Sequence, residues 1–148
     1  MAKNVIYLGP IASEPQTIDR LCTGALLPGG LAYLNGAVLT VAAAAQNGAE
    51  MFVINNRREV GQDVATAYTS GDTANAYKPV PGEKYQVRMA AETFAVGDKL
   101  TTGASGRLTK TLAAGDVVQA YFADTAGAYS AGDLAAVTWA GAGGTTPA

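Results

Sequence analysis

Short apolar runs bounded by glycine, asparagine and proline dominate the chain after its first thirty residues. Each run is too short to form a stable helix, and β-branched and aromatic side chains are frequent in the runs. Asn35-Gly36 and Asn47-Gly48 are dipeptides typical of tight turns between two strands. Further along, residues 85–91 alternate between apolar and polar side chains, which favours a half-buried strand. The pattern predicts β-strands at 31–34, 38–41, 51–54 and 85–91.

The C-terminal half repeats one unit, a Gly-Asp pair followed by an apolar run. The pairs begin at residues 97, 115 and 132, and the strands predicted after them span 99–102, 117–123 and 134–139. We interpret each pair as a turn, because glycine supplies a positive φ and aspartate bonds to nearby backbone. A calcium loop would need several oxygen ligands close together, and these aspartates are isolated. Regular short strands with glycine turns predict an all-β fold: a small β-barrel or sandwich with a C-terminal meander.

Three segments differ from this pattern. In residues 1–30, three prolines interrupt short strands predicted at 4–8 and 17–22, so we expect an extended N-terminal arm with edge strands that adds little to the core. Residues 31–139 would form the barrel or sandwich domain, and residues 140–148, AGAGGTTPA, a flexible tail. Within the domain, residues 55–81 carry few bulky side chains and are predicted to form a long surface loop, which often contacts a partner.

Composition narrows the function. The chain has 148 residues with a net charge of -2, 30 alanines, 18 glycines, one cysteine and no histidine. Without histidine there is no Ser-His or Cys-His pair and no histidine metal ligand, so we expect neither an enzyme nor a metal or other cofactor. The charge argues against nucleic acid and anionic lipid, no apolar stretch is long enough to span a membrane, and nothing indicates a small-molecule substrate. The opening residues do not resemble a signal peptide, which favours synthesis in the cytoplasm.

Abundant alanine and little charge indicate a protein that completes its burial against other chains. Tyrosine suits such interfaces because it joins an apolar body to a polar tip. The adjacent arginines at 57 and 58 suit the rim of a contact with another subunit. The candidate interface residues are Tyr7, Ile11, Ile18 and Arg20 in the arm, Arg57, Arg58, Tyr68 and Tyr77 in the predicted loop, and Tyr129.

Four segments resemble head decoration, or cement, proteins of tailed bacteriophages. They are GPIASEPQTIDRLCTGALLPGG (9–30), ATAYTSGDTANAY (65–77), VRMAAETFAVGDKLTTGASGRL (87–108) and GDVVQAYFADTAGAYSAGDLAAV (115–137). The phrase AxxxFAVGDxL before a glycine turn and a closing meander is typical of that group. None of these segments is a catalytic signature.

The resemblance implies a small β-rich protein, often a homotrimer, that binds the outside of the expanded capsid and holds neighbouring copies of the major capsid protein together. It implies a place on the exterior of the virion after synthesis in the host bacterium, and no catalysis. Two alternatives stay open: a tail tube or minor tail protein, and a carbohydrate-binding β-module. The second needs a flat platform of exposed aromatic rings, which one tryptophan, Trp139, supports poorly.

Overall fold

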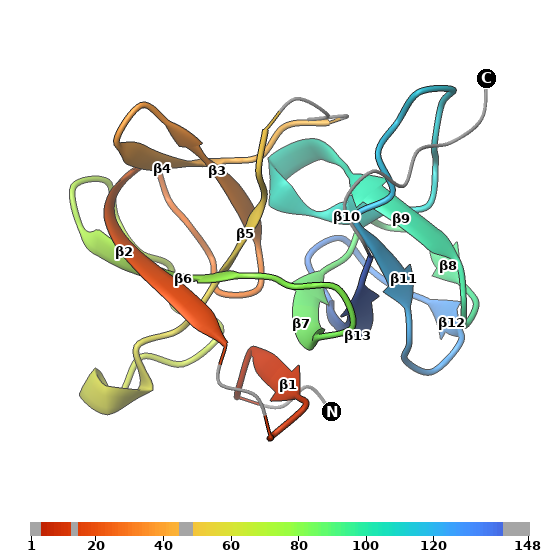
Figure 1. Ribbon diagram of the computed structural model, residues 1–148, viewed down its shortest axis with the longest axis horizontal. Coiled ribbons are helices and arrows are strands. Elements are labelled where there is room, and N and C mark those ends of the chain that lie inside the picture. Colours follow the sequence, from red (N-terminus) through yellow and green to blue (C-terminus); the bar gives the residue numbers. More distant parts are fainter. Residues whose placement is uncertain (1–3, 13–14, 45–48, 141–148) are drawn as a thin grey trace.

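The structure, a computed structural model, describes residues 4–12, 15–44 and 49–140 and is built from β-strands (Figure 1). Five strands close a barrel in the order β2 (Gln16–Thr23), β4 (Val38–Val41), β3 (Leu31–Asn35), β5 (Phe52–Ile54) and β6 (Thr73–Lys78). A six-stranded sheet lies beside it in the order β1 (Tyr7–Gly9), β7 (Lys84–Arg88), β13 (Leu134–Trp139), β11 (Ala120–Phe122), β9 (Lys99–Thr102) and β10 (Leu108–Thr109). A two-stranded sheet pairs β8 (Thr93–Phe94) with β12 (Gly127–Ala128). Two single 3-10 turns, η1 (Arg58–Val60) and η2 (Ala104–Gly106), complete the described elements.

The C-terminal meander is present as predicted. Strand β11 pairs antiparallel with β9 on one side and with β13 on the other. Strand β13 continues into an antiparallel pairing with β7, in which Val137 lies opposite Tyr85. Alternate residues of β13, namely Ala135, Val137 and Trp139, face the core and are buried. The alternation of side chains along β13 therefore matches the burial of one face of this sheet.

The Gly-Asp pairs are turns, as the sequence indicates. In each turn the aspartate N–H donates to the carbonyl three residues earlier, and its carboxylate accepts a hydrogen bond from that same earlier residue's N–H. The carboxylate bonds are Asp98 to Ala95 at 2.8 Å, Asp116 to Ala113 at 2.8 Å and Asp133 to Ser130 at 2.9 Å. A fourth turn of this kind precedes β6, where Asp72 accepts from Thr69 at 2.9 Å. The aspartates therefore serve local backbone geometry.

The core consists of two clusters. One lies inside the barrel and includes Leu26, Leu39 and Phe52. The other spans the barrel and the six-stranded sheet, and aromatic rings join its parts, since the ring centroid of Tyr85 lies 5.4 Å from that of Tyr77 and 6.4 Å from that of Trp139. The second cluster is therefore a shared core that joins the barrel to the sheet, while the first belongs to the barrel alone.

Two glycines allow the backbones of the barrel and the sheet to approach each other. A Cβ on Gly106 would lie 2.6 Å from the carbonyl oxygen of Leu31 in β3, and Gly106 has a φ of +70°. A Cβ on Gly29 would lie 2.5 Å from Cδ2 of Leu134 in β13. Real Cβ atoms do not approach other atoms so closely. At Gly106 the nearest atom is backbone, so a larger residue must displace β3, whereas at Gly29 the nearest atom ends a leucine side chain that can move aside.

The expected N-terminal arm is largely built into the fold. The strands predicted at 4–8 and 17–22 appear as β1 and β2, but β2 closes the barrel by pairing with β6 along six residues, from Gln16 to Leu21. Ile6 is buried in the shared core and Leu26 in the barrel. The expectation that residues 1–30 add little to the core is therefore wrong. The prolines mislead because Pro10, Pro15 and Pro28 stand outside both strands, where they remove no ladder hydrogen bond.

The long surface loop expected over 55–81 is also wrong in part, because β6 lies within it. This strand pairs with both β2 and β5 in the barrel. Its inward residues include Ala74 and Ala76, which are fully buried. A barrel of few strands has a narrow interior that small side chains can fill, so the absence of bulky residues did not mean the absence of a strand. The turn predicted at Asn47-Gly48 and residues 141–148 of the predicted tail lie outside the described residues. Ala140, the first residue of that predicted tail, is buried.

Candidate functional site

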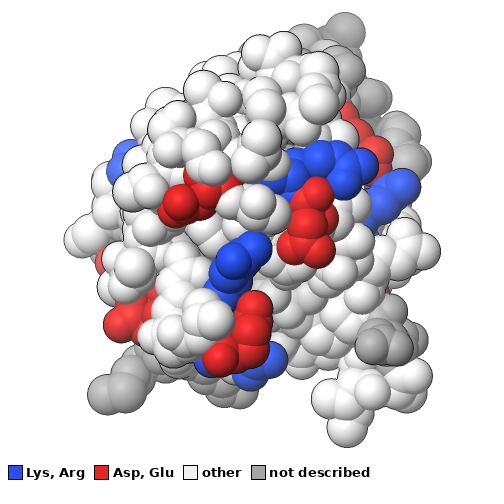
Figure 2. Space-filling view, turned by 90° about the vertical axis from the view of Figure 1, so that its left-hand side faces the viewer, with Lys and Arg blue, Asp and Glu red and all other residues white. Residues whose placement is uncertain are grey.

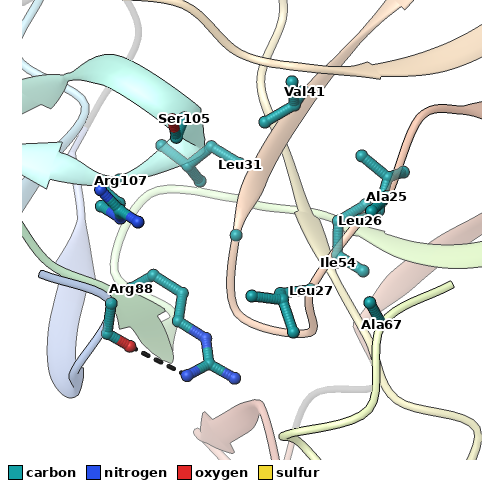
Figure 3. A pocket seen from close by; sticks show the side chains of 12 residues that line it. Ala25, Leu26, Leu27, Leu31, Val41, Ile54, Ala67, Arg88, Ser105 and Arg107 are labelled. Carbon is teal, nitrogen blue, oxygen red and sulfur yellow. Dashed lines mark hydrogen bonds between the residues drawn. The ribbon is translucent and has the colours of Figure 1, made fainter.

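A pocket of about 360 Å³ opens between the barrel and the six-stranded sheet (Figure 3). On the barrel side its walls are apolar, and on the sheet side they carry two arginines and a serine. Leu26, Leu31 and Ile54 are buried and form the deep part of the barrel wall. Leu27 and Val41 stand nearer to solvent, with 42% and 39% of their surfaces exposed. The pocket therefore presents an accessible apolar wall opposite basic side chains.

Arg88, at the end of β7, holds the two sides of the pocket together. Its Nε donates to the Pro28 carbonyl in the β2–β3 loop at 3.0 Å. Its Nη1 donates to the Gly132 carbonyl at 2.9 Å, the hydrogen bond drawn as a dashed line in Figure 3. Its Nη2 donates to the carbonyl of Val64. Burial lowers the pKa of Arg88, and the nearby carboxylate of Asp133 opposes that change. The guanidinium stays charged, because arginine does not lose its proton in proteins.

Arg107 and Ser105 line the same pocket from the segment around η2. In the described part of the chain, the Arg107 guanidinium makes no hydrogen bond or ion pair. Ser105 is exposed and has a φ of 59°, a left-handed conformation that few residues other than glycine adopt. These two side chains therefore present hydrogen-bond donors at the pocket that the described residues do not use.

The structure buries two of the tyrosines predicted to face a partner. Tyr68 is packed in the barrel core, and its hydroxyl donates to the Asn55 carbonyl at 2.7 Å. Tyr77 lies in the shared core against the rings of Tyr7 and Tyr85. The prediction that Tyr68 and Tyr77 offer their rings to a partner is wrong, because the chain's own core already covers them. Burial also raises the pKa of the Tyr68 hydroxyl.

The other candidates in the N-terminal segment lie apart from the pocket. Tyr7 is half-buried at the edge of the shared core, and its hydroxyl donates to the Pro10 carbonyl at 2.6 Å. Ile11, in the loop after β1, is 98% exposed. Ile18 packs partly on the barrel core, whereas Arg20 on the same strand is exposed. Of these four, Ile11 and Arg20 are the side chains most open to a partner.

The remaining candidates flank other loops. Arg57 is half-buried, and Arg58 is exposed in η1. Tyr129 packs edge-on against Phe94 and Phe122, and its hydroxyl donates to the Thr125 carbonyl. The nine candidates thus do not form one site. For the seven other than Tyr68 and Tyr77, a role at an interface stays a prediction.

Sequence reasoning missed the pocket. Leu27 is one of the two leucines in the LLPGG segment, and Val41 ends an ordinary apolar run, so neither carries a sequence signal of exposure. Tyr121 lies within the strand predicted at 117–123, but its side chain points outward from β11 and is 40% exposed. Only the pairing of strands determines which of these apolar residues the protein covers.

The described surface shows neither a patch of one charge on the face in Figure 2 nor a cluster of metal-ligating side chains. The barrel face in Figure 2 carries basic and acidic side chains in mixed order among uncharged residues. Within the described ranges, no group of three or more histidine, cysteine, aspartate or glutamate side chains could hold a metal ion. No helix in that part of the chain is long and apolar enough to cross a membrane.

Comparison with known proteins identifies the fold. No protein-family model matches the chain, and no curated protein matches it. Among solved structures, the fold is similar to the head fiber gp8.5 N base of bacteriophage phi29, with a TM-score of 0.59 and 18% sequence identity. The alignment covers 86% of this chain and 95% of that chain. The protein therefore shares its fold, over most of its length, with the base of a phage head fiber.

Proposed function

We propose that this protein is a structural component of a bacteriophage particle. In this role it binds the outer surface of the head as a homotrimer, holds neighbouring copies of the major capsid protein together and carries out no catalysis. The observation that carries the proposal is the fold shared with the phi29 head-fiber base over 86% of this chain. The sequence resemblance to head decoration proteins supports the same location independently, because it rests on short segments rather than on the fold.

The exposed side chains suit a protein that binds a repeating surface. Ile11 and Val96 on loops and Val60 at the end of η1 are large apolar residues, and each is mostly exposed. Such residues lose contact with water when a partner covers them, which favours association. On a lattice of identical sites, subunits that also bind one another convert a modest affinity for each site into strong retention.

The alternative of a carbohydrate-binding module is disfavoured by the aromatic residues. Trp139 is only 8% exposed and lies against Tyr85 in the shared core. Tyr121 is the one aromatic residue among the exposed large apolar side chains of the described chain. A single exposed ring does not form the flat platform on which a sugar stacks.

Electron microscopy of the source particle tests the proposal against a role in the tail. Density for this protein at the junctions between capsomers is the expected result, and density confined to the tail would overturn the proposal. In a second experiment, purified protein is added to heads that lack it, and the temperature of DNA release is measured. We expect a higher release temperature, and no change would contradict the cementing role. Sedimentation of the free protein, and its stoichiometry on the particle, test the trimer.

A further inference from the structure

The lining of the pocket between the barrel and the six-stranded sheet indicates which kind of ligand the pocket can bind. Its two sides differ in chemistry: the barrel supplies apolar side chains, and the sheet supplies Arg88, Arg107 and Ser105. None of the twelve lining residues is acidic, although the whole chain has a net charge of -2. The pocket is therefore locally basic on an acidic protein, which favours a ligand with negative charge.

The two arginines have different tasks. Three N–H groups of Arg88 donate to the backbone carbonyls of Pro28, Val64 and Gly132, so its side chain is fixed as part of the pocket wall. The charge of Asp133 acts on the pKa of Arg88, but the Asp133 carboxylate accepts its hydrogen bond from the Ser130 N–H. Arg107 has no such partner within the described residues. A guanidinium offers a planar fork of donors that fits a carboxylate, so Arg107 is the residue able to receive one.

The apolar wall points to a ligand larger than a single small anion. Leu26, Leu31 and Ile54 give it depth, and Leu27 and Val41 extend it to the rim, where both are partly exposed. A carboxylate alone would contact Arg107 and leave this wall in water. A chain that carries apolar side chains beside an acidic one would cover the wall, the rim and the guanidinium together. Ser105, two residues before Arg107, adds a hydroxyl that can donate to a backbone carbonyl of such a chain.

We propose that this pocket binds an extended protein segment in which apolar residues neighbour an aspartate or glutamate. The apolar side chains lie against Leu27 and Val41, and the carboxylate pairs with Arg107. That the segment belongs to a phage head protein rests on the proposed function; the chemistry of the segment rests on the pocket alone.

Peptide binding tests the chemistry without any phage particle. Four fluorescently labelled eight-residue peptides are used, built from leucine and glutamate, leucine and lysine, leucine and serine, or serine and glutamate. Fluorescence anisotropy with the full chain should show binding of the leucine–glutamate peptide at least tenfold tighter than of the other three. If the wild-type protein binds none of the four, or binds the lysine or serine peptides equally well, the proposal is overturned.

Charge reversal at one residue separates a binding role from a structural one. Arg107→Glu should weaken the leucine–glutamate peptide at least tenfold and should now favour the leucine–lysine peptide. The fold should survive, because Arg107 makes no side-chain bond in the described structure. The matched control is Lys84→Glu, which makes the same charge change at an exposed position of β7 that does not line the pocket, and it should leave peptide binding unchanged. Equal peptide binding by wild type and Arg107→Glu would overturn the proposal.

The same variants distinguish this inference from the proposed function. If heads retain the wild type but lose Arg107→Glu, both proposals are supported. If heads retain both proteins equally, the head-binding function stands and the pocket is not the contact. If heads do not bind the wild type while its peptide selectivity is intact, the proposed function fails and the pocket's specificity stands.

Discussion

Gly106 offers a direct test of how closely the barrel and the six-stranded sheet must approach. In Gly106→Ala, the new Cβ would lie 2.6 Å from the Leu31 carbonyl oxygen and 3.0 Å from Cγ2 of Val41. The Leu31 oxygen cannot move away freely, since it accepts a hydrogen bond from the Ala42 N–H at 2.9 Å. A left-handed backbone costs a residue other than glycine about 1–2 kcal/mol, and overpacking costs about 1–3 kcal/mol. The stiffer unfolded chain returns about 0.4–1 kcal/mol. We therefore expect the free energy of unfolding to fall by about 1–4 kcal/mol.

Gly36→Ala is the matched control. Gly36 has a similar φ of +65°, but nothing lies within 4 Å of the position its Cβ would take. Only the conformational terms apply, so the expected loss is about 0–1.5 kcal/mol. Urea unfolding, followed by circular dichroism and by Trp139 fluorescence, measures the loss in each variant. The comparison holds if the slope of the free energy of unfolding against urea concentration is the same as in the wild type. Equal losses in the two variants would refute the argument that Gly106 is required by the contact between the sheets.

Three further predictions concern turns, pH and the N-terminal segment. Asp98→Ala removes the carboxylate that accepts a hydrogen bond from the Ala95 N–H at 2.8 Å, so it should lower the free energy of unfolding by about 0.5–1.5 kcal/mol. The control Glu59→Ala, on the exposed turn η1, should change that free energy by less than about 0.5 kcal/mol. Hydrogen bonds from the Thr69 N–H and hydroxyl lower the pKa of Asp72. The contribution of Asp72 to stability is therefore complete above the unfolded-state pKa of about 3.9 and is lost as pH falls through the folded pKa. Measured by urea unfolding, the free energy of unfolding of Asp72→Asn should fall less steeply with decreasing pH than that of the wild type. An identical fall in both proteins would contradict this prediction. Ile6→Ala should cost about 2–5 kcal/mol because Ile6 is buried, and a loss below about 1 kcal/mol would show that the N-terminal segment is not core.

Local chemistry accounts for the features that sequence reasoning predicted well. The turn at Asn35-Gly36 and the Gly-Asp turns depend on residues within four positions of one another, so their signal is complete in the sequence. Strand β13 spans Leu134–Trp139, as predicted, because its alternation reflects one buried face. The all-β class and the C-terminal meander follow from these local elements, whereas the choice between a barrel and a sandwich does not.

Pairing between distant segments explains what was missed. Strand β2 runs parallel to β4 and antiparallel to β6, and this pairing brings residues 16–23 into the barrel although local prolines suggested an arm. Tyr68 sits in a glycine-rich segment that resembles a surface loop, yet a bridge between Leu26 and Tyr68 brings it into the core. No local pattern specifies such partners.

Short strands, the turns between them and the all-β class can be predicted from the sequence, because each depends on neighbouring residues and on a period of two. The folded chain is needed to know which tyrosines are buried, that β6 closes the barrel, and that Leu27 and Val41 face Arg107 across a pocket. These features depend on burial, and burial depends on which strands become neighbours. In this chain that choice rests on contacts between segments far apart in sequence, such as Gly106 against Leu31.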